Sequence, residues 1–314
     1  MGLADVSIQR LLPASGAGEL GHREASPAAA GVWSPGELGV GQVLDRAFEL
    51  FLHRFGTYVG FVTLFLLPIH LAAELFVLAP PTDQSFFVAY GQGIFTFFIV
   101  LWGVARVFVA TLAGSDALGR PLPVSHALRA TLARLPGLIL LLLLATLIQA
   151  AGFLACVLPV FLVVWLLEPA LPVFALESGV APAPGGGRRR DVLGFSAAFD
   201  ALRRAPRIAR GGSSLLRWVA CTFLSLVFAA PFLLQFQSFQ SELGFREALQ
   251  AELPPAGTAL VLACASAFLQ AIGLGFRSVV VCVFYLDERV RKEGLDLELA
   301  LARRNALRAG RSAR

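Results

Sequence analysis

The longest apolar run in this chain, Pro136 to Leu176, constrains its fold more than any other feature. The run holds 41 residues, and only one of them, Glu168, is charged. As one helix it would extend about 60 Å, twice the roughly 30 Å of hydrocarbon in a bilayer. We therefore interpret the run as two membrane-spanning helices joined by a tight hairpin near Gly152 to Pro159.

The composition is that of a membrane protein. Hydrophobic residues make up 57% of the 314 residues and charged residues 15%, with a mean hydropathy of +0.73, whereas soluble domains carry about 25% charged residues. These values exclude an ordinary soluble globule. The apolar runs predict an all-α integral membrane protein with six transmembrane helices: Thr57–Ala79, Phe86–Ala113, Pro136–Ala155, Val157–Leu176, Ser214–Phe236 and Gly257–Tyr285.

The distribution of Arg and Lys predicts the orientation of these helices, because short cytoplasmic loops collect basic residues. Basic residues are concentrated before the first span, in the second and fourth loops and after the last span. The first and third loops have none, and the fifth has only Arg246. Six spans with both termini in the cytoplasm fit this pattern. We expect residues 1–35 to be a disordered extension, residues 36–290 the membrane domain and residues 291–314 a basic cytoplasmic tail.

Three amphipathic stretches precede three of the predicted spans. In each of them, apolar residues at helical spacing lie opposite charged residues, the pattern of a helix lying flat at a membrane interface. Leu44, Leu128 and Leu202 occupy corresponding positions. The sequence therefore predicts three copies of one unit, a cytoplasmic interfacial helix followed by a membrane hairpin.

Among the charged residues inside the predicted spans, where each costs about 2.5 to 3.5 kcal/mol to insert, three stand out. Counted from the predicted cytoplasmic helix ends, Arg106, Glu168 and Arg277 lie at a common depth of roughly 10 to 12 Å. With Gln270 on the face of Arg277, they form a candidate intramembrane polar cluster whose net positive charge suits an anionic group such as a lipid phosphate. The alternative is structural: the arginines reach the headgroups, or the ions fix helix register.

Other features of the spans bear on packing. Pro169, directly after Glu168, predicts a kink in the fourth span. A ladder of small residues in the sixth span predicts close approach of another helix, within the chain or from a second copy. The ladder consists of Ala259, Ala263, Ala267, Ala271 and Gly275. After this span, acidic residues alternate with Arg and Lys, which indicates a solvated face: Asp287, Glu288, Glu293 and Asp296.

Two segments carry a recognisable family pattern, Gly36 to Phe48 and Phe284 to Leu297. Together they resemble the bacterial membrane-domain family named after the membrane portion of some glycerophosphoryl diester phosphodiesterases. The similarity covers most of the chain from Gly36 to Leu297, with an insertion at Ala181 to Arg190. It implies a multi-pass helical protein of the bacterial inner membrane, often standing alone and without an established biochemical role.

The catalytic portion of such phosphodiesterases has a His-Arg-Gly segment and an acidic cluster. The nearest string here is Gly21-His22-Arg23-Glu24, and none of the four His residues is spaced as a metal pair. We therefore expect no enzyme activity, no metal and no cofactor.

The predicted function is a non-enzymatic membrane domain that associates with lipids, anionic ones among them, or with a membrane protein such as a second copy. Nucleic-acid binding is not expected, because the basic residues flank membrane segments and form no continuous surface. Two alternatives stay open. One is a transporter or permease subunit for an anionic amphiphile, and the other is an enzyme acting on lipid headgroups.

Overall fold

A computed structural model describes residues 38–78, 84–119, 121–155, 167–177, 194–209, 212–242, 249, 251–252 and 254–294. All regular secondary structure in this part of the chain is helical. The all-α class predicted from the sequence therefore holds for the described residues. The expected disordered extension (1–35), the insertion at 181–190 and most of the expected basic tail lie outside them.

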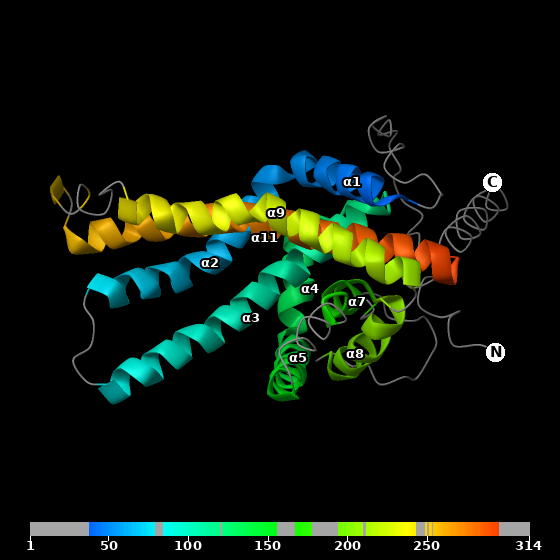
Figure 1. The fold of residues 1–314 in the computed structure, drawn as a ribbon, viewed down its shortest axis with the longest axis horizontal. Helices are drawn as coiled ribbons and strands as arrows, with labels where there is room; N and C mark the ends of the chain where they lie inside the picture. Colours follow the sequence, from blue (N-terminus) through cyan, green and yellow to red (C-terminus); the bar gives the residue numbers. More distant parts are fainter. Residues whose placement is uncertain are drawn as a thin grey trace, which may run out of the picture.

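Four long helices run lengthwise through the molecule: α2 (Phe55–Leu78), α3 (Gln84–Ala117), α9 (Gly212–Glu242) and α11 (Pro255–Glu293). At the left-hand end in Figure 1, α2 and α9 finish and α3 and α11 begin. We call this the hairpin end. Among the long helices α11 is central, because it packs against α2, α3 and α9.

Shorter helices surround the opposite half of the bundle: α1 (Val40–His53), α4 (Val124–Ala133), α7 (Ala170–Glu177) and α8 (Phe195–Ala209). A further apolar helix, α5 (Leu135–Ala155), packs against α8 and α3. In Figure 1 α1, α7 and α8 lie around the right-hand part of α11. We call this the short-helix end.

Each of three short helices leads almost directly into a longer apolar one. A single turn residue, Arg54, separates α1 from α2, and Arg134 separates α4 from α5, whose axes are bent by 64°. The third pair is α8, ending at Ala209, and α9, beginning at Gly212. This is the first half of the repeated unit predicted from the sequence. The three corresponding leucines are all half-buried: Leu44, Leu128 and Leu202.

Three described helices are long and apolar enough to cross a membrane: Phe55–Phe76, Phe97–Ala117 and Ala256–Lys292. The bent pair α4 and α5 makes a fourth if it is counted as one span. In α9 the apolar stretch among described residues is the shorter Ser214–Phe228. Half of the fourth predicted span, residues 157–166, lies outside the described residues. The described part of the chain thus supports three or four crossings, and six stays a prediction.

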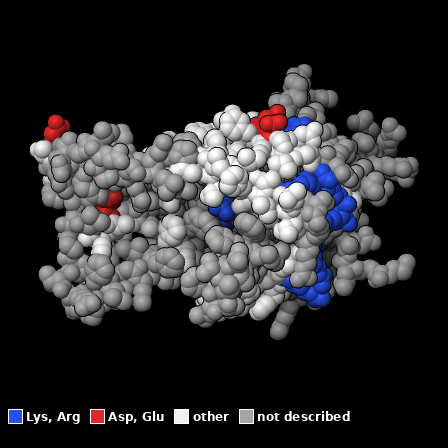
Figure 2. Space-filling view, in the orientation of Figure 1, with Lys and Arg blue, Asp and Glu red and all other residues white. Residues whose placement is uncertain are grey.

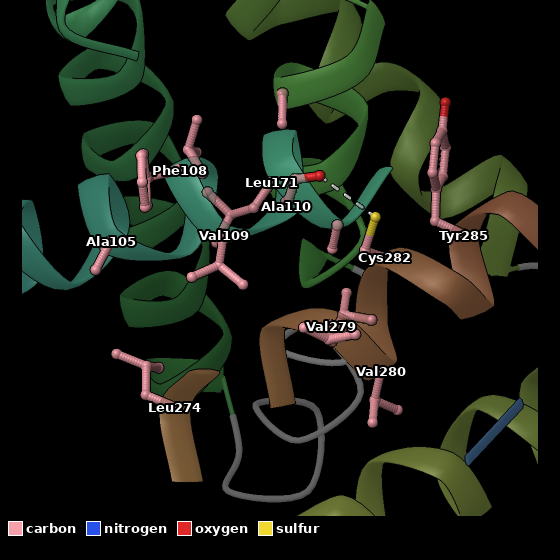
Figure 3. Packing of buried hydrophobic residues seen from close by; sticks show 14 of the residues in the cluster. Ala105, Phe108, Val109, Ala110, Leu171, Leu274, Val279, Val280, Cys282 and Tyr285 are labelled. Carbon is pink, nitrogen blue, oxygen red and sulfur yellow. Dashed lines mark hydrogen bonds between the residues drawn. The ribbon is translucent and has the colours of Figure 1, made fainter. Parts of the chain in front are cut away.

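The core lies where α3, α7 and α11 meet. Figure 3 shows Phe108 of α3, Leu171 of α7 and Val279 of α11 in this region, and all three are buried. The Cys282 thiol donates a weak hydrogen bond to the carbonyl of Ala110, with sulfur and oxygen 3.5 Å apart. Residues of three sequence-distant helices therefore share one apolar interior.

The ladder of small residues on α11 packs inside the molecule. All five of its members are buried: Ala259, Ala263, Ala267, Ala271 and Gly275. A Cβ added at Gly275 would lie 3.1 Å from Phe51 and 3.9 Å from Tyr58. The ladder therefore serves helix packing within the chain, which is the first of the two uses predicted for it.

Candidate functional site

Arg106, Glu168 and Arg277 come together from three separate elements. Arg106 is on α3, Arg277 is on α11, and Glu168 lies in the turn before α7. Arg106 Nη2 donates to Glu168 Oε1 at 2.8 Å. Arg277 donates to the same oxygen from Nε at 2.9 Å, with its Nη2 at 2.8 Å. We call these three side chains the Glu168 cluster, and its formal net charge is +1.

Proline chemistry explains why Glu168 is available at this point of an apolar run. Pro169 has no N–H to donate, and its ring disfavours helical backbone at the preceding residue. The chain turns at Glu168 and Pro169, and α7 begins at Ala170, with the Val173 N–H bonded to the Pro169 carbonyl at 3.1 Å. The kink predicted here is thus a break, and it leaves the carboxylate within reach of both α3 and α11.

Two of the three side chains of the Glu168 cluster are buried. Glu168 is 6% exposed and Arg106 5%, whereas the Arg277 side chain is 22% exposed. The Trp102 ring covers the Arg106 guanidinium, with 4.6 Å between Cζ and the ring centroid, a cation–π contact. Arg277 is therefore the side from which another molecule can approach.

Two atoms of the cluster have unused hydrogen-bonding capacity. Glu168 Oε2 and Arg106 Nε are buried and have no hydrogen-bond partner in the described part of the chain. Buried polar atoms in proteins are nearly always paired with protein or water. The cluster therefore has one acceptor and one donor for a further group.

Both arginines lie at the same position along their helices. Arg106 is the 23rd residue of α3 and Arg277 is the 23rd of α11, and both helices begin at the hairpin end (Figure 1). At 1.5 Å per residue, each arginine is about 33 Å from that end. The sequence placed them close to the opposite helix ends, but α3 continues to Ala117 and α11 to Glu293.

Gln270, the fourth candidate, does not join the Glu168 cluster. Its Oε1 lies 2.7 Å from Nε2 of His70, which donates the hydrogen bond in the tautomer that carries its proton on Nε2. Gln270 is two helical turns before Arg277, and its partner is on α2. The residue therefore links α2 to α11.

A second ion cluster lies near the end of α11. Asp287 and Glu288 are both 0% exposed, so the prediction that these two residues lie on a solvated face is wrong. Arg217 of α9 pairs with both carboxylates, and its Nη1 lies 2.9 Å from Glu288 Oε1. Arg291 and Lys292 pair with them along α11 at 3.0 and 3.1 Å. Charge alternation in the sequence here marks buried ion pairs.

Leu38 attaches the start of the described chain to this second cluster. Its N–H donates to Asp287 Oδ1 at 3.1 Å, and its carbonyl accepts from Arg217 and from Arg291, each at 2.7 Å. Leu38 and Asp287 belong to the two segments on which the family resemblance rests. Sequence reasoning treated those segments separately, and the structure joins them.

A third set of polar contacts holds the far end of α7. The hydroxyl of Tyr285 donates to Glu177 Oε1, and Arg204 of α8 donates to Glu177 Oε2. Arg289 lies 3.8 Å from Oε1 of the same carboxylate. Because Glu168 precedes α7 and Glu177 ends it, this buried helix is held to α11 at both ends.

A stripe of exposed side chains runs along α8, at the short-helix end. Phe195 and Phe199 are 40% and 57% exposed, and Arg203 and Arg207 follow at intervals of four residues and are also exposed. Asp200 is an exposed acid beside them. On the face drawn in Figure 2, most of the visible Lys and Arg side chains lie in the same half of the molecule. We call Phe195, Phe199, Arg203 and Arg207 the α8 stripe.

Within the described ranges, no group of three or more His, Cys, Asp and Glu residues could hold a metal ion. No protein-family model, curated protein or solved structure matches the chain. The family resemblance therefore stays a prediction.

Proposed function

We propose that this chain is a non-enzymatic, multi-pass domain of a bacterial inner membrane that binds anionic lipids at its short-helix end. In this arrangement the short-helix end faces the cytoplasm and the hairpin end faces the opposite side. The observation that carries the proposal is the α8 stripe, in which exposed Phe and Arg side chains share one helix face.

The long helices support a membrane environment. Leu64 on α2, Phe223 on α9 and Phe268 on α11 are 61%, 62% and 46% exposed. Soluble monomers rarely expose large contiguous apolar patches, whereas in a bilayer such side chains contact lipid chains. The outward apolar residues of several helices are then explained together.

The α8 stripe has the composition of a helix at a membrane surface. Phe195 and Phe199 can enter the boundary between headgroups and acyl chains. Arg203 and Arg207 have no ion pair in the described part of the chain, and each basic residue near an anionic surface contributes about 1 kcal/mol. On α1, Leu52 is 53% exposed and adds to the apolar side chains at this end.

Thiol labelling in membrane vesicles tests the placement. Cys264 is exposed and is the tenth residue of α11, so it lies about 14 Å from the start of the helix and inside the hydrocarbon. In a chain whose other cysteines are replaced by alanine, Cys264 should resist an impermeant maleimide until SDS is added. Labelling of Cys264 in intact vesicles would contradict the proposed span.

Two single-cysteine variants of an otherwise cysteine-free chain test the orientation. Glu252→Cys at the hairpin end and Arg203→Cys on α8 replace exposed residues. The first should label only from outside the cell, and the second only in inverted vesicles. Labelling of both from one side would overturn the arrangement.

Lipid binding is measured by native mass spectrometry of the purified protein with equal amounts of phosphatidylglycerol and phosphatidylcholine. Arg203→Gln/Arg207→Gln should reduce the retained phosphatidylglycerol several-fold. Glu49→Gln, which removes an exposed acid from α1, is the matched control and should not reduce it. Equal retention of both lipids by wild type would contradict anionic-lipid binding.

A further inference from the structure

We propose that the Glu168 cluster binds the headgroup of a single anionic phospholipid that carries free hydroxyl groups. The lipid phosphate lies at Arg277, and a headgroup hydroxyl donates to Glu168. This inference rests on the membrane placement proposed above and deepens it by naming the chemical class of the ligand.

The position of the cluster suits a lipid headgroup. Arg106 and Arg277 are each about 33 Å from the hairpin end along α3 and α11. The hydrocarbon of a bilayer is roughly 30 Å thick. If these helices enter the hydrocarbon at the hairpin end, both guanidinium groups lie at the opposite boundary, where lipid phosphates are found.

The charge of the cluster selects an anion of charge −1. Two arginines and one glutamate leave a net +1, and two of the three side chains are almost fully buried. An uncompensated buried charge is costly, so a phosphodiester, which carries one negative charge, balances the site. Arg277 contacts Glu168 through Nε and Nη2, which leaves Nη1 to donate to a phosphate oxygen.

Glu168 supplies the second part of the selection. Its Oε2 is buried without a partner and, as a carboxylate oxygen, needs a donor. Phosphodiester oxygens only accept hydrogen bonds, so the phosphate alone cannot satisfy this atom. A hydroxyl on the same headgroup can do so. A headgroup carboxylate would instead face Glu168 with like charge.

Arg106 acts from the buried side. Its Nε also has no partner, and Trp102 holds its guanidinium in place. A hydroxyl that donates to Glu168 Oε2 still has lone pairs, which can accept from such a donor. A hydroxyl therefore matches the types of both spare atoms, one acceptor and one donor, and one phosphate matches the charge of the cluster.

The experiment compares two lipids with the same phosphodiester charge, phosphatidylglycerol and phosphatidylmethanol, of which only the first has headgroup hydroxyls. Purified wild-type protein is incubated with equal amounts of both and of phosphatidylcholine, and retained lipid is counted by native mass spectrometry. We expect phosphatidylglycerol to exceed phosphatidylmethanol about 2- to 10-fold, the effect of one hydrogen bond. Equal retention of the two would overturn the proposal without any variant.

Variants then assign the preference to the cluster. Glu168→Gln should bring the ratio of the two anionic lipids close to one. Arg277→Gln should remove the bound molecule of both lipids, whereas Arg277→Lys should retain it in part. A ratio unchanged by Glu168→Gln in a protein with wild-type thermal stability would place the hydroxyl contact elsewhere and overturn the proposal.

Two further arms separate the possible failures. Inorganic phosphate should not displace phosphatidylglycerol, and displacement at millimolar concentration would show a site for soluble phosphate. If anionic lipids are retained over phosphatidylcholine but respond only to Arg203→Gln/Arg207→Gln, this inference fails and the proposed function stands. If wild type shows no preference for anionic lipids, both fail.

Discussion

The backbone N–H of Leu38 donates to the carboxylate of Asp287 at 3.1 Å, although 249 positions separate the two residues. Asp287 is fully buried, and its other oxygen pairs with Arg217 and Arg291. Asp287 therefore holds the segment before α1 against α9 and α11.

Asp287→Asn should loosen the segment before α1, because a neutral amide is a weaker acceptor for the Leu38 N–H and a weaker partner for the two arginines. We expect faster hydrogen exchange in a peptide that covers residues 38–43, measured by mass spectrometry in detergent. Glu49→Gln on the exposed face of α1 is the control and should leave that exchange unchanged. Unchanged exchange in Asp287→Asn would show that the N-terminal segment is held by other contacts.

Arg217→Ala should lower thermal stability strongly. It removes a partner of Asp287 and Glu288, both fully buried, and breaking a buried pair costs about 3 to 5 kcal/mol. Arg291 and Lys292 still pair with these acids, so we expect the lower end of this range. Intrinsic tryptophan fluorescence, to which the buried Trp218 next in sequence contributes, reports the transition.

Two further variants are controls for Arg217→Ala. Arg217→Lys keeps the charge and should recover part of the loss. Arg203→Ala, an exposed arginine on α8, should be neutral. A similar loss for Arg203→Ala and Arg217→Ala would mean that the ion cluster has no special role in stability.

Tyr285→Phe should cost about 1 kcal/mol, the usual net value of one hydrogen bond. The hydroxyl donates to Glu177, which keeps Arg204 and Arg289 as partners. The cost is measured by thermal unfolding of the four proteins in a double-mutant cycle with Glu177→Ala. In the Glu177→Ala background Tyr285→Phe should cost almost nothing, and an equal cost in both backgrounds would contradict the contact.

Gly114→Ala should weaken the packing of α7 on α3. A Cβ at Gly114 would lie 2.5 Å from Leu176 Cδ2 and 2.9 Å from Cδ1, so the leucine has to move. Overpacking of this kind typically costs 1 to 3 kcal/mol. Thermal unfolding in detergent measures the loss.

Leu176→Ala in the same chain should remove the clash, so the double variant should be less destabilised than additivity predicts. Gly60→Ala on α2 is the matched control, because nothing lies within 4 Å of its added Cβ. Additive losses in Gly114→Ala/Leu176→Ala would contradict the close approach.

The sequence predicted the helical class and brought out the three charged residues of the Glu168 cluster for one physical reason. A charge in an apolar run is costly, so Arg106, Glu168 and Arg277 stand out against their neighbours. Pro169 indicated the break for a different local reason, because proline interrupts an α-helix. Conspicuous exceptions to an apolar pattern can be found without any knowledge of tertiary structure.

Contacts between distant segments could not be predicted from the local pattern. The charge pattern around Asp287 and Glu288 on α11 fits a solvated face and a buried ion cluster equally well. The difference is made by Arg217, 70 positions earlier in the chain. Tyr285 counted as apolar in the predicted sixth span, so its hydrogen bond to Glu177 was equally invisible.

Helix lengths were the other source of error. The sequence ended its second and sixth spans at Ala113 and Tyr285, where hydropathy declines. The helices continue to Ala117 and Glu293, where polar residues have partners within the fold: Asp116, for example, pairs with Arg54 at 3.1 Å. The depth predicted for the Glu168 cluster was counted from those helix ends, so the longer helices change that depth.

The attachment of α7 at both of its ends has a consequence for how the chain is made. A ribosome delivers Glu168 and Glu177 long before it delivers Arg277, Tyr285 and Arg289. Until α11 is synthesised, neither carboxylate has its full set of partners, and a chain truncated before Pro255 retains two underpaired acids. The last helix of the described chain thus completes the pairing of both acids.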